Sequence, residues 1–135
     1  MAVAGWRHLL PREGQAMTTP TEDLEPCMKA CAEALLATRQ CANACIRSGD
    51  RLLEACALLG LDCAAICEAT IGALSRESEH HGDFCALCAH LCRACADECE
   101  KHQHAHCRRC ALACRACAAV CDQHAGERHA LGAHA

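Results

Sequence analysis

Residues 85–121 read CALCAHLCRACADECEKHQHAHCRRCALACRACAAVC, and cysteine recurs in them at steps of three and four residues. Side chains at positions i, i+3 and i+4 share one face of an α-helix, and a seam repeating every 3.5 residues is normally filled with Leu, Ile or Val. One or two buried cysteines act as small apolar side chains, but ten in register indicate a helical seam of metal ligands. The ten are Cys85, Cys88, Cys92, Cys95, Cys99, Cys107, Cys110, Cys114, Cys117 and Cys121.

The same spacing upstream predicts two further helices with cysteine on one face. Their cysteines are Cys27, Cys31, Cys41, Cys45, Cys56, Cys63 and Cys67. Ser48, Gly49 and Asp50 supply a glycine stop and then a new N-cap, and so short a turn makes the flanking helices antiparallel neighbours. The sequence therefore predicts an all-α fold, an antiparallel up-down-up-down four-helix bundle with cysteines lining the core. Its helices are expected over 24–47, 51–74, 79–102 and 105–124.

Local features refine these helices. Thr21 or Asp23 is the expected N-cap of the first helix, and Ser78 that of the third. Gly60 lies within the second helix, where glycine costs about 1 kcal/mol relative to alanine. This glycine indicates either space kept for something other than a side chain or a close helix–helix contact, and the sequence leaves both open.

With 135 residues, the chain is expected to form one domain. We predict a bundle over 21–125 between flexible tails over 1–20 and 126–135. The usual aromatic filling of a core is missing, since the sequence has one Trp, one Phe and no Tyr. Alanine and cysteine gain less from burial than leucine or phenylalanine, so a further component must help to fill the core.

Seventeen cysteines in 135 residues are typical of a disulfide scaffold or a metal protein. The odd number and the helical spacing argue against disulfides, which staple loop-rich secreted domains. Residues 1–20 contain no apolar run of signal-peptide length, no small-residue cleavage site and no paired arginines. A cytoplasmic location is therefore expected, where thiols stay reduced.

Several classes of function are disfavoured. The net charge of −4, with interspersed signs, offers no basic patch or aromatic platform, so no nucleic-acid partner is expected. No membrane partner is expected either. A thiol oxidoreductase places its C-x-x-C at a helix N-terminus beside a strand, but no strand pattern and no carboxylate–histidine–nucleophile set occur here. The protein is therefore not expected to be an enzyme.

Most of the cysteines form C-x-x-x-C pairs, so that both thiolates of a pair project from adjacent turns and can hold one metal ion. Thiolate ligands select Cu(I), zinc or iron–sulfur clusters. Buried thiolate charges must be neutralised, and Cu(I) at about one ion per sulfur does so. A four-cysteine zinc site keeps a double negative charge, and zinc or iron–sulfur ligands usually lie on turns or loops. Cu(I) is the predicted metal, with a metallothionein-like buffer for zinc or mixed soft metals as the alternative.

These residues resemble the bacterial copper storage proteins, specifically their cytosolic members. The resemblance covers 24–124 and rests on the C-x-x-x-C pairs, on two C-x-x-C-x-x-x-C runs that begin at Cys85 and Cys107, and on the histidine-rich turn. It implies a four-helix bundle that stores many Cu(I) ions on cysteines, usually as a homotetramer. It also implies that copper enters at one end of the bundle, where histidine or methionine assists. His102, His104 and His106 match that position.

The predicted topology assigns the remaining side chains to particular places. The turns after the first and third helices meet at one end, which brings Cys45 to the histidines of 102–106. His81 and His124 fall on seam positions at the other end, whereas His90 falls on the outer face. Apolar residues of the first two helices also point away from the seam, and an exposed apolar patch usually marks an interface, so a homo-oligomer is expected. They are Leu35, Leu36, Leu52, Leu58, Leu59 and Ile66.

Overall fold

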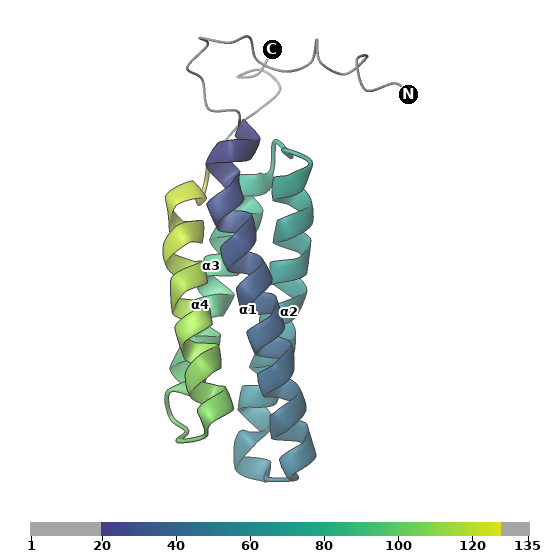
Figure 1. Cartoon of the computed structure of the whole chain (residues 1–135), viewed down its shortest axis with the longest axis vertical. Helices are drawn as coiled ribbons and strands as arrows, with labels where there is room; N and C mark the ends of the chain where they lie inside the picture. The colour runs from purple at the N-terminus through teal and green to yellow at the C-terminus, as the bar shows by residue number, and fades with distance from the viewer. Residues whose placement is uncertain (1–19, 128–135) are drawn as a thin grey trace, which may run out of the picture.

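The structure, a computed structural model, describes residues 20–127, which contain long helices and no strand within that range. The elements are, in order, α1 (Pro20–Ser48), the short 3₁₀-helix η2 (Arg51–Leu53), α2 (Glu54–Ser75), α3 (His81–Cys99) and α4 (Ala105–His124). Figure 1 shows the four α-helices running alternately up and down, with α1 and α3 each packed against α2 and α4. The predicted four-helix bundle is confirmed.

The helix α1 begins at Pro20, before both of its predicted N-caps, Thr21 and Asp23. That prediction is wrong, because proline itself suits the first turn of a helix, where a missing N–H costs no hydrogen bond. Pro26 lies inside α1, in its second turn. Residues 1–19 and 128–135, on which most of both predicted tails fall, lie outside the described residues.

The turn between α1 and α2 has the predicted chemistry. Gly49 adopts a φ of 68°, in the left-handed region that favours glycine. The carboxylate of Asp50 accepts a hydrogen bond from the backbone N–H of Leu52 at 2.9 Å and so caps the next helical turn. The two helices consequently lie antiparallel, with the turn at the lower end in Figure 1.

The helix α3 is shorter than predicted at both ends. The Ser78 hydroxyl accepts a hydrogen bond from the N–H of His80 at 3.1 Å, but the helix starts only at His81. At the other end the α-helix stops at Cys99. The carbonyl of Cys99 accepts a hydrogen bond at 3.1 Å from the N–H of His102, three residues later, instead of from the fourth residue as in an α-helix. The Nε2 of His102 lies 3.0 Å from a carboxylate oxygen of Glu98, in the last turn of α3.

Gly60 marks a close contact between α1 and α2, which decides between the two readings that its sequence position allowed. A Cβ at this position would lie 3.2 Å from the carbonyl oxygen of Thr38 and 3.4 Å from the Cβ of Ala42. Glycine therefore lets the two backbones approach, and no space is kept there for another component.

We expect Gly60→Leu to lower the free energy of unfolding by about 1–3 kcal/mol, because the larger side chain forces α1 away from α2. Gly60→Ala is the matched control, since its tight contact is offset by about 1 kcal/mol of improved helix propensity. Denaturant titration of the reduced protein, followed by circular dichroism, measures both variants. Equal stability of the leucine variant and the unmodified protein would contradict the contact.

Cysteine and alanine make up most of the core, and leucine closes its ends at Leu24, Leu53 and Leu74. The two buried threonines satisfy their hydroxyls within their own helices. The Thr38 Oγ1 donates to the carbonyl of Ala34 at 2.7 Å, and the Thr70 Oγ1 donates to the carbonyl of Ile66 at 2.6 Å. Apart from Thr38, Thr70 and His81, the buried side chains of the described bundle that can bind a metal or form hydrogen bonds are cysteine thiols.

The C-terminal turn after α4 docks on the beginning of α3. Gly126 adopts a φ of 74°, and its N–H donates to the carbonyl of Gly82 at 3.0 Å. A Cβ at Gly82 would collide with the backbone of Glu127, so only glycine admits this approach. The turn holds Glu127 over one end of the bundle.

The outer face of the bundle carries large apolar side chains. The segment Arg51–Ser75 is long and apolar enough to cross a membrane by length and composition, with a mean hydropathy of 1.6 in its most apolar window and 44% of that window buried. The exposed large apolar residues are Leu36, Ile46, Leu52, Leu58, Leu61, Leu87 and Leu112. Leu35, Leu59 and Ile66, also predicted for the outer face, are partly buried.

Candidate metal centre

All seventeen cysteines point into the bundle and none is paired in a disulfide. Their exposed fractions lie between 0% at Cys27 and 3% at Cys45, so all of them are buried. This follows from the spacing, since steps of three and four residues keep the cysteines of each helix on the face that meets the other three helices. The interior is therefore a column of free thiols along the bundle axis.

The sulfur atoms of different helices lie within reach of a common ion. The Sγ atoms of Cys56 and Cys99 are 3.4 Å apart, and those of Cys31 and Cys88 are 4.0 Å apart. Two sulfurs bound to one ion by bonds of about 2.3 Å lie no more than about 4.6 Å apart. A disulfide would need about 2.05 Å. The spacing thus fits metal bridging between thiolates without a large movement of the helices.

Groups of three or four sulfurs lie within 4.8 Å of one another at successive levels of the column. Near the middle, two groups share both Cys88 and Cys117, so the levels are not separate sites. The groups include Cys27 with Cys85 and Cys121, then Cys31 with Cys88, Cys117 and Cys121, then Cys67 with Cys88, Cys92 and Cys117, then Cys41 with Cys99 and Cys110, and Cys41 with Cys45, Cys56 and Cys107.

Burial and hydrogen bonds between neighbouring thiols together determine the protonation of these cysteines. Burial is the leading cause at Cys56 and Cys107. It raises the pKa of Cys56 to about 12 and also raises that of Cys107. Within a cluster, neighbours affect one another in opposite directions: hydrogen bonding by Cys114 lowers the pKa of Cys110, while the same contact raises that of Cys114. One thiolate is therefore stabilised only where its neighbours keep their protons, and filling the column with metal must release protons.

One histidine reaches the thiol column at the end formed by the α1–α2 and α3–α4 turns. The Nδ1 of His106 lies 3.3 Å from the Sγ of Cys41 and 3.5 Å from that of Cys107. Desolvation, with His104 and Arg109 nearby, lowers the pKa of His106 and so favours a neutral ring with a free lone pair. His106 can therefore share an ion with these two thiolates.

The other two histidines predicted for this site take different positions. His104 is exposed and stacks on His106, with ring centroids 5.3 Å apart. The Nε2 of His102 lies 3.0 Å from a carboxylate oxygen of Glu98, and this hydrogen bond lowers the pKa of Glu98. The structure thus brings all three histidines to one end, but only His106 contacts the sulfurs.

The opposite end holds His81, which is fully buried, and His124, which is mostly buried, as their seam positions predict. His90 is exposed on the outer face, also as predicted. No pattern in the sequence indicated Glu127, whose carboxylate contacts both His81 and His124. Glu127 comes directly after Gly126. A glycine just after a helix was the only sign in the sequence that the chain turns back beyond α4.

Comparison with known proteins supports this geometry. The copper storage protein family matches residues 20–126. The chain belongs to this family. The Cu(I)-bound structure of a Bacillus copper storage protein, BsCsp3, is 37% identical, covers 77% of this chain and 99% of its own, and has a TM-score of 0.74.

Two further relatives extend the comparison. A structure described as copper loading to a cytosolic copper storage protein from Streptomyces lividans, with five coppers, is 35% identical over 78% of this chain and 93% of that chain, at a TM-score of 0.71. A cysteine-rich protein of Bacillus subtilis, YhjQ, whose function is uncharacterised, is 40% identical over 59% of this chain and 75% of its own length. The family resemblance inferred from the motifs is confirmed.

Proposed function

We propose that this protein stores many Cu(I) ions in the cytoplasm, inside its four-helix bundle. The observation that carries this proposal is the column of seventeen buried, unpaired cysteines with sulfurs 3.4–4.0 Å apart. Two relatives support it, one described as a Cu(I)-bound storage protein and one as a cytosolic copper storage protein. No enzymatic activity is part of the proposal.

The proposed ligands are all seventeen cysteines, with the histidine-rich turn assisting copper at one end. His106 is the proposed nitrogen ligand of that end, because its Nδ1 is in contact with two sulfurs. His104 and His102 lie around it, where they can receive a copper ion before the thiols do. The cysteine ligands are Cys27, Cys31, Cys41, Cys45, Cys56, Cys63, Cys67, Cys85, Cys88, Cys92, Cys95, Cys99, Cys107, Cys110, Cys114, Cys117 and Cys121.

Charge favours Cu(I) over zinc as the stored ion. Each buried thiolate must be balanced by a cation, since an uncompensated charge in the core costs several kcal/mol. Cu(I) balances about one thiolate per ion, whereas a zinc ion with four thiolates leaves two negative charges behind. A zinc-filled column would therefore accumulate charge, and a metallothionein-like zinc buffer is the weaker alternative.

An anaerobic titration of the reduced protein with Cu(I), against a chromogenic chelator, tests the proposal. We expect uptake of well over four copper equivalents, released protons in proportion, and little displacement by added zinc. Zinc should instead saturate at about four ions, since each needs about four thiolates. Saturation with copper near four equivalents, or ready exchange for zinc, would support the alternative.

The contact of His106 with Cys41 and Cys107 leads to a kinetic prediction. His106→Ala should slow the initial uptake of Cu(I) several-fold and change the final capacity little, because the thiols of the column remain. Stopped-flow transfer of Cu(I) from a chelator measures both quantities. His90→Ala, which removes an exposed histidine of α3, is the matched control and should behave like the unmodified protein. Identical rates in both variants would remove His106 from the uptake route.

The exposed apolar residues of α1 and α2 support a homo-oligomer, and we propose a homotetramer with this face as the contact. Leu36, Leu52 and Leu58 are each more than half exposed, and an exposed apolar patch usually marks an interface. The same surface carries Arg39 paired with Glu68, charges that would be costly in lipid, so we propose no membrane partner. Nor do we propose a nucleic-acid partner. A monomeric mass by light scattering would contradict the assembly.

A further inference from the structure

Two histidines and a carboxylate converge at the bundle end opposite His106. His81 is the first residue of α3 and its side chain is 1% exposed, and His124 is the last residue of α4. The Nε2 of His81 lies 2.9 Å from Oε1 of Glu127. The Nδ1 of His124 lies 3.2 Å from both oxygens of the same carboxylate. The three groups come from two helices and the turn that follows the second.

The backbone determines which ring nitrogen of His81 carries a hydrogen. Its Nδ1 lies 2.9 Å from the carbonyl oxygen of Ser78, and a carbonyl oxygen can only accept, so Nδ1 carries a hydrogen. In a neutral imidazole Nε2 then bears a lone pair, which faces the carboxylate of Glu127. Two lone pairs at this distance require a positive particle between them, either a proton or a metal ion.

The arrangement of His81 is typical of a metal ligand. A metal-bound histidine almost always donates its other ring N–H to a carbonyl or carboxylate, which fixes the ring and its tautomer. Nitrogen and oxygen ligands bind zinc at about 2.0–2.2 Å, which places neighbouring ligand atoms about 3.3 Å apart. The observed nitrogen–oxygen distances of 2.9 and 3.2 Å are close to that value.

The rings of His81 and His124 have centroids 6.4 Å apart. Two imidazoles on one zinc ion would hold their centroids about 5–6 Å apart at these bond lengths. Ligation therefore requires His124 to move about 1 Å toward His81. This side chain ends α4, where no further helical turn restrains it.

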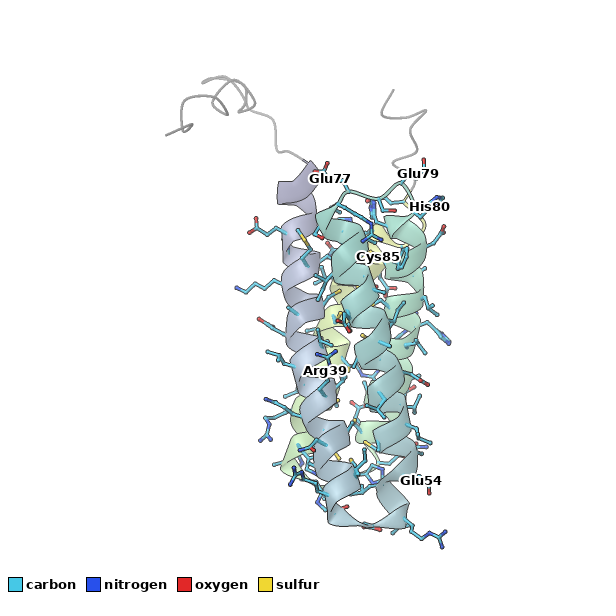
Figure 2. All side chains as sticks on the ribbon, turned by 90° about the vertical axis from the view of Figure 1, so that its right-hand side faces the viewer. Arg39, Glu54, Glu77, Glu79, His80 and Cys85 are labelled. Carbon is cyan, nitrogen blue, oxygen red and sulfur yellow. The ribbon has the colours of Figure 1, made fainter. Side chains whose placement is uncertain are left out.

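The position of Glu127 is built into the fold. The positive φ of Gly126 turns the chain, its N–H holds the carbonyl of Gly82, and the missing Cβ of Gly82 admits the Glu127 backbone. Figure 2 shows the loop with Glu77, Glu79 and His80 at this end, and Cys85 lies one level deeper. Since the Nδ1 of His81 contacts the carbonyl of Ser78 in that loop, the three groups lie at this end of the bundle.

We propose that His81, His124 and Glu127 bind one divalent ion of the zinc class. Imidazole and carboxylate suit zinc, whereas Cu(I) prefers thiolate, so this site differs in chemistry from the storage column. The bound ion would tie α3 to α4 and to the turn after it. It would thereby close the bundle beyond Cys27, Cys85 and Cys121, a role in addition to the proposed storage of copper.

The test uses full-length protein whose thiols are first saturated with Cu(I), so that zinc cannot bind them. Zinc is then added at a buffered free concentration, and metal content is measured after equilibrium dialysis. The histidine turn at the other end can also bind zinc. The quantity compared is therefore the difference in zinc content between each variant and the unmodified protein. Glu127→Gln and His124→Ala should each hold one zinc equivalent fewer, with affinity lowered at least about tenfold.

Glu79→Gln is the matched control, because Glu79 forms an exposed pair with His80 at 3.2 Å at the same end. It should bind as much zinc as the unmodified protein. In ¹⁵N NMR spectra of the histidine side chains, zinc should change the chemical shift of Nε2 of His81. The hydrogen on Nδ1 should be retained. Equal zinc content in Glu127→Gln and the unmodified protein would overturn the proposal and identify the bridging particle as a proton. Copper content of the same samples tests the storage function separately.

Discussion

The reduced, copper-free protein should unfold as the pH rises above about 8.5, the pKa of a cysteine in an unfolded chain. In the folded state burial raises the pKa of Cys56 to about 12 and also raises that of Cys107. The unfolded chain therefore loses these protons first. The stabilisation is fully present below about pH 8.5 and is lost as the pH approaches about 12.

The expected loss is large because several thiols contribute. Each thiol with a raised pKa lowers the free energy of unfolding by about 1.4 kcal/mol per pH unit in this window. A few such groups remove a typical total of about 5–15 kcal/mol within one or two pH units. Denaturant titrations at a series of pH values, followed by circular dichroism, measure the slope.

The copper-loaded protein is the control for this experiment. Its thiols have already given up their protons to bind metal, so its stability should change little over the same range. The same steep loss in both forms would contradict an origin in the thiols. It would point instead to lysines on the surface, a residue type that ordinarily titrates in this range, such as Lys101 paired with Glu98.

Removing Cys88 and Cys117 together should cost more than two copper equivalents. Both cysteines belong to two of the sulfur groups, so Cys88→Ala with Cys117→Ala leaves each of those groups with two of its four thiols. The empty fold should survive, since each loss of a buried sulfur costs about 1–2 kcal/mol. Copper capacity is measured by the same anaerobic titration.

A double variant at the two ends of the column serves as its control. Cys27→Ala with Cys45→Ala removes the same number of sulfurs, one from a group of three at one end and one from a group of four at the other. It should lose about two equivalents if each thiolate balances about one Cu(I). Equal losses in the two double variants would show that each thiol binds independently of its neighbours.

The periodicity of the cysteines made the bundle and its lining predictable. A step of three or four residues can keep one face buried only in a helix, and the short turn at Gly49 left antiparallel packing as the outcome. The helix ends were less predictable. Pro20 and Thr21 both suit a helix start, and α3 ends at Cys99 although the predicted helix continued to His102.

The relations between elements could not be derived from spacing alone. Gly60 was compatible with two opposite interpretations until the distance to Thr38 on α1 was known. Which sulfurs share a level depends on the axial offset of four helices, and sequence spacing fixes only the offset within each one. Glu127 was invisible for a similar reason, since its partners precede it in the chain by up to 46 residues.

The two ends of the thiol column differ, with His106 in contact with sulfur at one end and the docked turn of Gly126 and Glu127 covering the other. When ions enter and leave a column of sites through one end only, the ion bound last is the first to leave. If copper enters at the histidine end, as proposed, ions held by Cys27, Cys85 and Cys121 would be the last to leave the bundle. Ions held by Cys41, Cys45 and Cys107 would then exchange rapidly, so a partly filled protein and a full one would supply copper at different rates.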